Sequence, residues 1–504
     1  MKKTVTMLVC LTLCLVLCAS LLTSCSAPND GNAPENDPGY SESPADGEAS
    51  TFAENPFLSA AEAPVSTFSA DVDTASYTYF RKLVNSGYPL SQLKRGFAET
   101  FRTEEFVNYF RYTANAPRDG ELFGVTAAMA PAPWNAQDML LRLTLEAAAA
   151  VPAGGNNLVF LIDVSGSMAS VDKLPLLQDT FALLTDQLTD ADRVSIVTYS
   201  GEEKIVLSGT PGSQKETILA AIRSLRASGS TNGEAGLRMA YSLAADWFIE
   251  GGNNRIIMAS DGDLNVGISD PEELKTFIEG KRDAGIYLSV LGFGTGNYRD
   301  ANMEALADNG NGAYYYIDGA SEAERVFGTN LLSTLYTVAN DVKLQLTFDP
   351  AYIDEYRLIG YENRVMSAED FENDRKDAGE VGAGTQVTVL YELKLTAAAA
   401  AAASGTTAGG DIPAWMKLAV RYKNPGEPTS HLNEYGIGAS DVRTPDDDFL
   451  FMASVAETVM LLHDSRYGGR SLDDVLRTLN DLDMTGQSDR AEFRGLVNAL
   501  NEKK

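Results

Sequence analysis

The segment from residue 156 to 340 alternates between short apolar runs and amphipathic helical patterns, and this alternation constrains the fold most strongly. Residues 158–162 form a continuous apolar run, which is typical of a strand buried on both faces. Helical spacing of three and four then follows, at Leu174, Leu177, Phe181, Leu184 and Leu188. Further strands are expected at residues 194–199, 255–259 and 287–293. The order predicts an α/β fold with a doubly wound, mostly parallel sheet covered by helices on both faces.

The regions on either side of this segment alternate with a period of two, which predicts half-buried strands. The clearest example is Leu141, Leu143 and Leu145. We therefore expect the α/β unit (residues 156–340) to be inserted in one β-rich domain formed by residues 121–155 and 341–425. Helical patterns predict an N-terminal helical segment over residues 67–120 and a C-terminal one over residues 426–504. The alanine run at residues 397–403 is interpreted as a low-complexity loop.

The first residues predict export from the cytoplasm. Lys2 and Lys3 precede an uncharged apolar run over residues 4–22, and Leu22-Thr23-Ser24-Cys25 follows. This order resembles the bacterial lipoprotein signal, in which cleavage occurs before a cysteine that carries lipid. The resemblance implies a signal peptide over residues 1–24, lipidation of Cys25, and a protein anchored at the cell membrane and facing outside the cytoplasm.

The chain after Cys25 is predicted to begin with a disordered tether. Residues 25–66 are rich in Pro, Gly, Ser and acidic residues and contain no Lys or Arg. The other three cysteines, Cys10, Cys14 and Cys18, lie within the signal, so no disulfide is expected in the mature protein.

The charge balance excludes one large class of partners. The chain has 40 basic and 70 acidic residues, a net charge of −30, which repels nucleic acid. The only two histidines, His431 and His463, are far apart in the sequence, which argues against histidine-rich zinc sites and Ser-His-Asp hydrolysis. We therefore expect no catalytic residues.

Oxygen-bearing side chains follow two of the predicted strands. Asp163, Ser165 and Ser167 come directly after the first buried strand, and Asp261 follows the strand at residues 255–259. Thr231 lies in a loop just before another predicted helix. Because the carboxyl ends of parallel strands meet at one edge of a sheet, these groups are expected to converge there. Carboxylates and hydroxyls are hard ligands that suit Mg²⁺, although Asp and Ser after a strand are also common turn and N-cap residues.

These motifs resemble a known binding site. Asp-x-Ser-x-Ser at residues 163–167, with a distant threonine and a distant Asp-Gly pair, resembles the metal-ion-dependent adhesion site of the von Willebrand factor type A domain. The stretches STFSADVDTASY and YRLIGYENR, together with the C-terminal helical region, resemble the YfbK-type bacterial lipoprotein family over nearly the whole mature chain.

The resemblance implies a role for each of five residues. Ser165 and Ser167 are expected to bind the metal directly, Thr231 directly or through water, and Asp163 and Asp261 largely through water. The cation is expected to be Mg²⁺, or another divalent ion such as Mn²⁺ or Ca²⁺. One coordination position would remain for an Asp or Glu of a protein partner. We expect these oxygens to face an open position, and a lysine ammonium filling it would argue against an adhesion site, because it would take the place of the cation.

The sequence thus favours a surface-anchored lipoprotein that binds a protein partner through a metal ion, without catalysis. Two alternatives remain open at this stage. One is a metal-dependent hydrolase of envelope polymers, with the ion activating water. The other is a structural scaffold in which the metal site is occupied internally.

Three other motifs predict structure rather than chemistry. Asp71-Val72-Asp73-Thr74 imitates a phosphatase motif, but no buried strand precedes it, so Asp73 or Thr74 is expected to cap a helix. The run Tyr314-Tyr315-Tyr316 predicts a strand near the edge of the sheet, and Gly292-Phe293-Gly294 predicts a tight turn after a strand.

Overall fold

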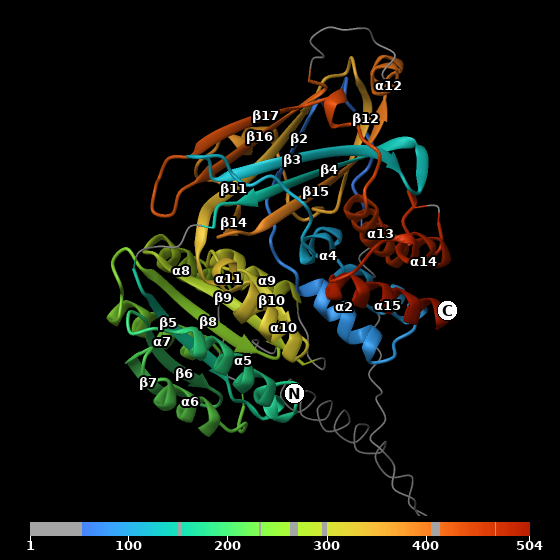
Figure 1. Ribbon diagram of the computed structural model, residues 1–504. Coiled ribbons are helices and arrows are strands. Elements are labelled where there is room, and N and C mark those ends of the chain that lie inside the picture. Colours follow the sequence, from blue (N-terminus) through green and yellow to red (C-terminus); the bar gives the residue numbers. More distant parts are fainter. Residues whose placement is uncertain are drawn as a thin grey trace, which may run out of the picture. The chain divides into compact units, whose positions relative to one another are not determined.

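The computed structural model describes residues 53–149, 154–230, 233–262, 271–294, 300–404, 414–468 and 470–503. Six strands form the central sheet of the α/β unit, in the order β10-β9-β8-β5-β6-β7 (Figure 1). All neighbours are parallel except β7, which runs antiparallel to β6. The strands are β5 (Asn156–Asp163), β6 (Arg193–Tyr199), β7 (Glu203–Pro211), β8 (Asn253–Ser260), β9 (Ile286–Phe293) and β10 (Tyr314–Ile317).

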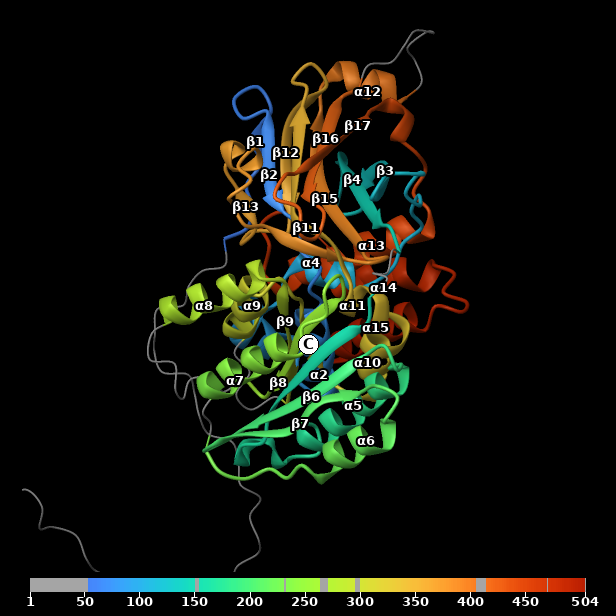
Figure 2. The same ribbon diagram turned by 90° about the vertical axis from the view of Figure 1, so that its left-hand side faces the viewer.

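Helices cover both faces of this sheet (Figure 2). On β5, the side chains of Leu158, Phe160 and Ile162 enter one core, and those of Val159 and Leu161 enter the other. The first core is covered by α5 (Leu174–Gln187) and α6 (Lys215–Ser224), and the second by α7 (Gly233–Asp246), α8 (Pro271–Asp283) and α9 (Asp300–Asn309). A strand buried on both faces needs apolar residues at every position, so the predicted doubly wound sheet is confirmed.

Two antiparallel sheets make up the β-rich domain. Their orders are β1-β12-β15-β4-β3 and β13-β2-β11-β16-β17, with β14 paired to β11. The first contains β1 (Leu58–Ser59), β12 (Ile353–Ile359), β15 (Gln386–Leu395), β4 (Asn135–Ala147) and β3 (Phe123–Ala132). The second contains β13 (Val365–Met366), β2 (Val65–Ser69), β11 (Thr337–Phe348), β16 (Met416–Lys423), β17 (His431–Ile437) and β14 (Gly379–Gly382).

Side chains of both sheets share one core, as the alternation at Leu141, Leu143 and Leu145 predicted. The strands β3 and β4 precede the α/β unit in the chain, whereas β11 to β17 follow it. The α/β unit is therefore inserted in the β-rich domain.

Three expectations need correction. The strands β1 and β2 begin at Leu58 and Val65, inside the range predicted as tether, because the short segments there pair with β12 and β11. Strand β17 occupies part of the range predicted as helical, pairing with β16. The alanine run is helix α12 (Ala397–Ala403), in which Thr396 accepts a hydrogen bond from the Ala399 amide and Ala399 is buried.

The helices at the two ends of the chain pack together (Figure 1). They are α2 (Ala75–Asn85), α3 (Leu90–Gly96), α4 (Thr103–Tyr109), α13 (Asp447–Leu462), α14 (Leu472–Asp481) and α15 (Ser488–Glu502). The Phe110 ring lies 4.9 Å from that of Phe451 and 5.7 Å from that of Phe493, measured between centroids. Such edge-to-face contacts join the two helical segments into one core. Within the described part of the chain, every helix is too short or too polar to cross a membrane.

Candidate metal centre

Two neighbouring strands bring the predicted acidic residues to one edge of the sheet. The strands β5 and β8 are parallel neighbours, so Asp163 at the end of β5 and Asp261 just after β8 lie side by side. The Ser260 hydroxyl donates a hydrogen bond to Asp163 Oδ2 at 3.2 Å and so links the two strand ends.

The turn after β5 places the two predicted hydroxyls together. The Ser165 amide donates to Asp163 Oδ1 at 2.8 Å, and the Ser165 and Ser167 Oγ atoms are 2.9 Å apart, within hydrogen-bond distance. Ser165 is buried, whereas Ser167 is exposed, so the turn faces solvent on one side. The structure therefore brings Asp163, Ser165, Ser167 and Asp261 together.

The loop that carries the predicted threonine lies against the same turn. The Gly166 amide donates to the Gly229 carbonyl at 3.0 Å, and the Ser228 amide donates to the Val164 carbonyl at 2.7 Å. Thr231 itself lies outside the described residues, as does Cys25.

The two carboxylates share a buried, negatively charged environment. Burial raises the pKa of Asp163 to about 6, and the nearby Asp261 charge adds to this rise, while hydrogen bonds from Ser165 and Ser260 oppose it. Asp261 Oδ1 is buried and has no hydrogen-bond partner among the described residues. Because buried polar atoms are almost always paired, an oxygen of this kind suits a cation. The oxygen donors fit a hard divalent ion.

Contrary to expectation, a lysine ammonium reaches this point. Lys173 Nζ lies 2.8 Å from Asp261 Oδ2, and the two side chains are 11% and 0% exposed. Lys173 precedes α5, and nothing in its sequence pattern indicated a contact with a residue 88 positions away. The ammonium neutralises one oxygen of Asp261 and leaves the other unpartnered among the residues that the structure describes.

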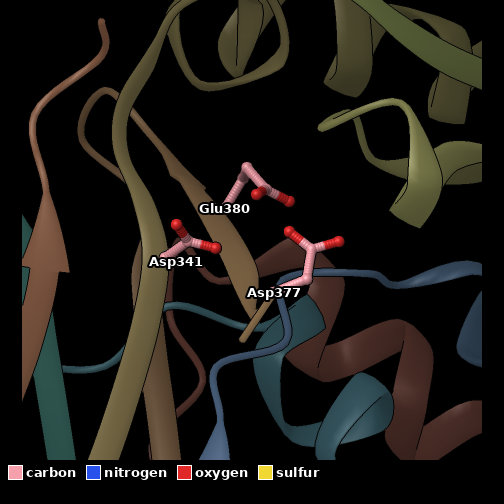
Figure 3. Close-up of side chains that lie close together, drawn as sticks. All are labelled: Asp341, Asp377 and Glu380. Atoms are coloured by element: carbon pink, nitrogen blue, oxygen red, sulfur yellow. The ribbon is translucent and has the colours of Figure 1, made fainter. Parts of the chain in front are cut away.

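A second acidic cluster, which the sequence reasoning missed, lies in the β-rich domain. The carboxylates of Asp341, Asp377 and Glu380 point toward a common space, with one oxygen of each within 4.8 Å of the others (Figure 3). Asp341 pairs with Lys423 at 2.6 Å and Asp377 with Arg282 at 2.7 Å. Two of the three carboxylates are thus already neutralised, so we interpret the cluster as an ion network.

The phosphatase-like motif has a structural role. Thr74 is the N-cap residue of α2, but its side chain makes no capping hydrogen bond. Asp73 Oδ1 instead accepts from the Tyr314 amide at 2.8 Å, and Asp71 pairs with Arg364 at 3.2 Å. Tyr314 begins β10, which is the edge strand that the tyrosine run predicted.

Comparisons with known proteins agree with this architecture. The family model of the von Willebrand factor type A domain matches residues 157–329, and a model described as von Willebrand factor matches residues 45–142. A model described as uncharacterized protein YfbK, C-terminal, matches residues 333–502. The sheet and these matches define a protein with a von Willebrand factor type A domain.

A full-length comparison then identifies the family. The chain is 41% identical to the uncharacterized protein YfbK of Escherichia coli (strain K12) over 437 residues, which are 82% of this chain and 74% of that protein. The chain therefore belongs to the YfbK family, as the sequence motifs indicated.

Other proteins match this chain with lower identity. Inter-alpha-trypsin inhibitor heavy chain H3 of Homo sapiens is 27% identical over 184 residues, which are 34% of this chain and 20% of that protein. The solved structure described as von Willebrand factor type A from Catenulispora acidiphila has 17% identity and a TM-score of 0.42, covering 75% of this chain and 89% of that chain.

Proposed function

We propose that this chain is a metal-dependent protein-binding module without catalytic activity. A von Willebrand factor type A domain is consistent with a role in protein interaction. The observation that carries the proposal is the convergence of two carboxylates and two hydroxyls at one sheet edge, with Asp261 Oδ1 buried and without a hydrogen-bond partner within the described ranges.

In this proposal Ser165 and Ser167 hold the cation directly, and Asp163 and Asp261 act mainly through water. Thr231, from the adjacent loop, contributes directly or through water. The bound ion, Mg²⁺ or alternatively Mn²⁺ or Ca²⁺, supplies the positive charge that attracts an Asp or Glu of the partner protein.

The proposal extends to the place of the protein in the cell. A lipid on Cys25 would hold the chain at the membrane, outside the cytoplasm, with a tether after it. Two acyl chains give stable anchoring, whereas a single chain binds reversibly.

Isothermal titration of the mature protein with Mg²⁺ tests the metal site. We expect binding to the wild type, loss of binding in Asp163→Ala, and unchanged binding in Asp179→Ala, a matched control on the exposed side of α5. Absence of binding, or equal binding in Asp163→Ala, contradicts the proposal. Recovery of a partner from envelope extracts with Mg²⁺, and its loss with a chelator, tests the protein-binding part.

One observation favours a second candidate, a scaffold whose site is closed from within. The Lys173–Asp261 ion pair gives Asp261 a cation from the chain itself. If the protein is such a scaffold, the ammonium takes the place of a metal ion, so a chelator changes neither its thermal stability nor its envelope contacts.

A further inference from the structure

The Lys173 side chain lies along a defined path to Asp261. Lys173 is the residue that directly precedes α5. Its side chain is 11% exposed and ends with the ammonium 2.8 Å from Asp261 Oδ2. A surface lysine commonly covers its stem but keeps its charged head in water, whereas the ammonium of Lys173 contacts a fully buried carboxylate. This lysine is largely covered, so the fold specifies its position.

The backbone directly after β9 packs against the Lys173 side chain. Gly294 has a φ of +74°, and a Cβ added there would lie 2.3 Å from Lys173 Cε and 2.8 Å from its Cγ. Any larger residue would displace the lysine stem. The Gly294 carbonyl also accepts a hydrogen bond from the Tyr316 hydroxyl at 2.7 Å, which fixes this segment to the neighbouring strand β10.

The carboxylate that Lys173 contacts is the one that the metal also needs. Asp261 is fully buried, and its Oδ2 accepts from the ammonium while Oδ1 has no hydrogen-bond partner among the described residues. An ammonium and a divalent cation repel each other strongly at a few ångströms in a buried site. Both therefore cannot be bound closely to Asp261 at the same time.

We infer that Lys173 is an internal counter-cation of Asp261, which neutralises the empty metal site and leaves Asp261 when a divalent ion binds. The inference rests on the proposed metal site and adds a residue that sets its affinity. Mg²⁺ then binds the wild type more weakly than it would bind a site without the Lys173–Asp261 pair. The difference in binding free energy is the free energy needed to break that pair.

The position of Lys173 connects metal binding to an exposed loop. Val171, two residues earlier, is 80% exposed, and Asp172 pairs with Lys82 on α2 at 3.4 Å. The flexible four-carbon stem of lysine lets the ammonium leave Asp261 and enter the solvent beside this loop. Occupancy of the site thus alters a surface that a partner protein can contact.

Calorimetry on the mature protein tests the competition. We expect Lys173→Gln and Lys173→Met to bind Mg²⁺ at least tenfold more tightly than the wild type, and their metal-free forms to unfold at a lower temperature. Lys275→Gln removes the same charge from the exposed side of α8 and is expected to match the wild type in both measurements. Equal or weaker Mg²⁺ binding by the Lys173 variants overturns the inference, even if the wild type binds the ion. Absence of binding in the wild type and in all variants overturns the proposed metal site as well.

A measurement on the unaltered protein does not depend on the folding of a variant. Acetic anhydride modifies accessible lysines, and mass spectrometry quantifies each site. We expect modification of Lys173 to rise severalfold when Mg²⁺ is added, while that of Lys275 stays constant. Constant Lys173 modification under conditions in which calorimetry shows Mg²⁺ bound overturns the inference.

Discussion

Arg81 Nε and Nη2 donate to the two carboxylate oxygens of Asp318, each over 2.7 Å. Arg81 lies on α2, and Asp318 directly follows β10, so this bidentate pair joins an N-terminal helix to the last strand of the central sheet. The same guanidinium contacts Glu322 at 2.9 Å and Glu492 at 3.0 Å, while its own side chain is only 4% exposed. One buried cation thus links three parts of the chain.

Replacing this cation is expected to be costly. Arg81→Met leaves Asp318 and Glu322 buried without their shared partner, and removing one member of a buried ion network costs about 3–5 kcal/mol. Urea unfolding measures the loss. Arg477→Met is the control, because Arg477 is 77% exposed in its pair with Asp474, and exposed pairs contribute about 0–1 kcal/mol. A loss below about 1 kcal/mol in Arg81→Met would show that the network does not stabilise the fold.

Substitution by alanine at two helical glycines is expected to change the stability of the protein in opposite directions. A Cβ at Gly236 on α7 would lie 2.8 Å from the Tyr199 Cβ, so Gly236→Ala forces the helix away from the sheet and costs about 1–3 kcal/mol. Gly280 on α8 is exposed and has nothing within 4 Å of its Cβ position, so Gly280→Ala stabilises the protein by about 0.5–1 kcal/mol. Thermal unfolding of the two variants beside the wild type checks both signs, and a shift in the same direction would contradict the packing argument.

The contribution of His463 to the stability of the protein is expected to fall in mild acid. Burial lowers the pKa of His463, although hydrogen bonds to the Phe101 and Ala98 carbonyls oppose this shift. Below about pH 6.5 the unfolded chain binds a proton at this histidine, whereas the folded chain stays neutral until a lower pH. The contribution of His463 to the free energy of unfolding therefore decreases as pH falls through this window, by up to about 1.4 kcal/mol per pH unit.

The variant His463→Gln isolates this contribution. It lacks the titrating group but keeps a side-chain N–H donor for the carbonyls. Urea unfolding at pH 7.5, 6.5 and 5.5 is expected to show a steeper loss for the wild type than for the variant. Parallel curves would mean that His463 is protonated equally in both states.

Removal of metal is expected to lower the stability of the wild type. At an Mg²⁺ concentration of one hundred times its dissociation constant, binding adds about 2.7 kcal/mol to the free energy of unfolding. Differential scanning calorimetry with Mg²⁺ and with a chelator measures the change. Asp261→Asn is expected to lose this dependence, and Asp179→Asn to keep it. A chelator effect of equal size in Asp261→Asn would place the ion elsewhere.

The sequence predicted the central sheet because its signal is local. A continuous apolar run, such as residues 158–162, by itself predicts a strand buried on both faces. The turn that carries Asp163, Ser165 and Ser167 follows this run directly. Parallel pairing then implied that Asp163 and Asp261 lie at one edge, and β5 and β8 are neighbours. The motifs also indicated the family correctly.

Contacts over long distances in the chain were not predictable in this way. Lys173 reaches Asp261 only because the backbone at Gly294 provides room, and no periodicity shows such a path. The strands β1 and β2 were missed because they are short. The composition of the region, rich in Pro, Gly, Ser and acidic residues, therefore gave a stronger signal than the pattern of the strands themselves. Helix α12 was missed because low complexity in the sequence was weighed above the high helix propensity of alanine.

The position of β2 has a consequence for the order of folding on the ribosome. Its residue 69 pairs with residue 343, and the whole α/β unit lies between them in the nascent chain. This unit contains every strand of its own sheet, so its pairing can be completed first. Strand β2 meanwhile stays unpaired until β11 has been synthesised, which exposes it to wrong pairing with other strands during biogenesis.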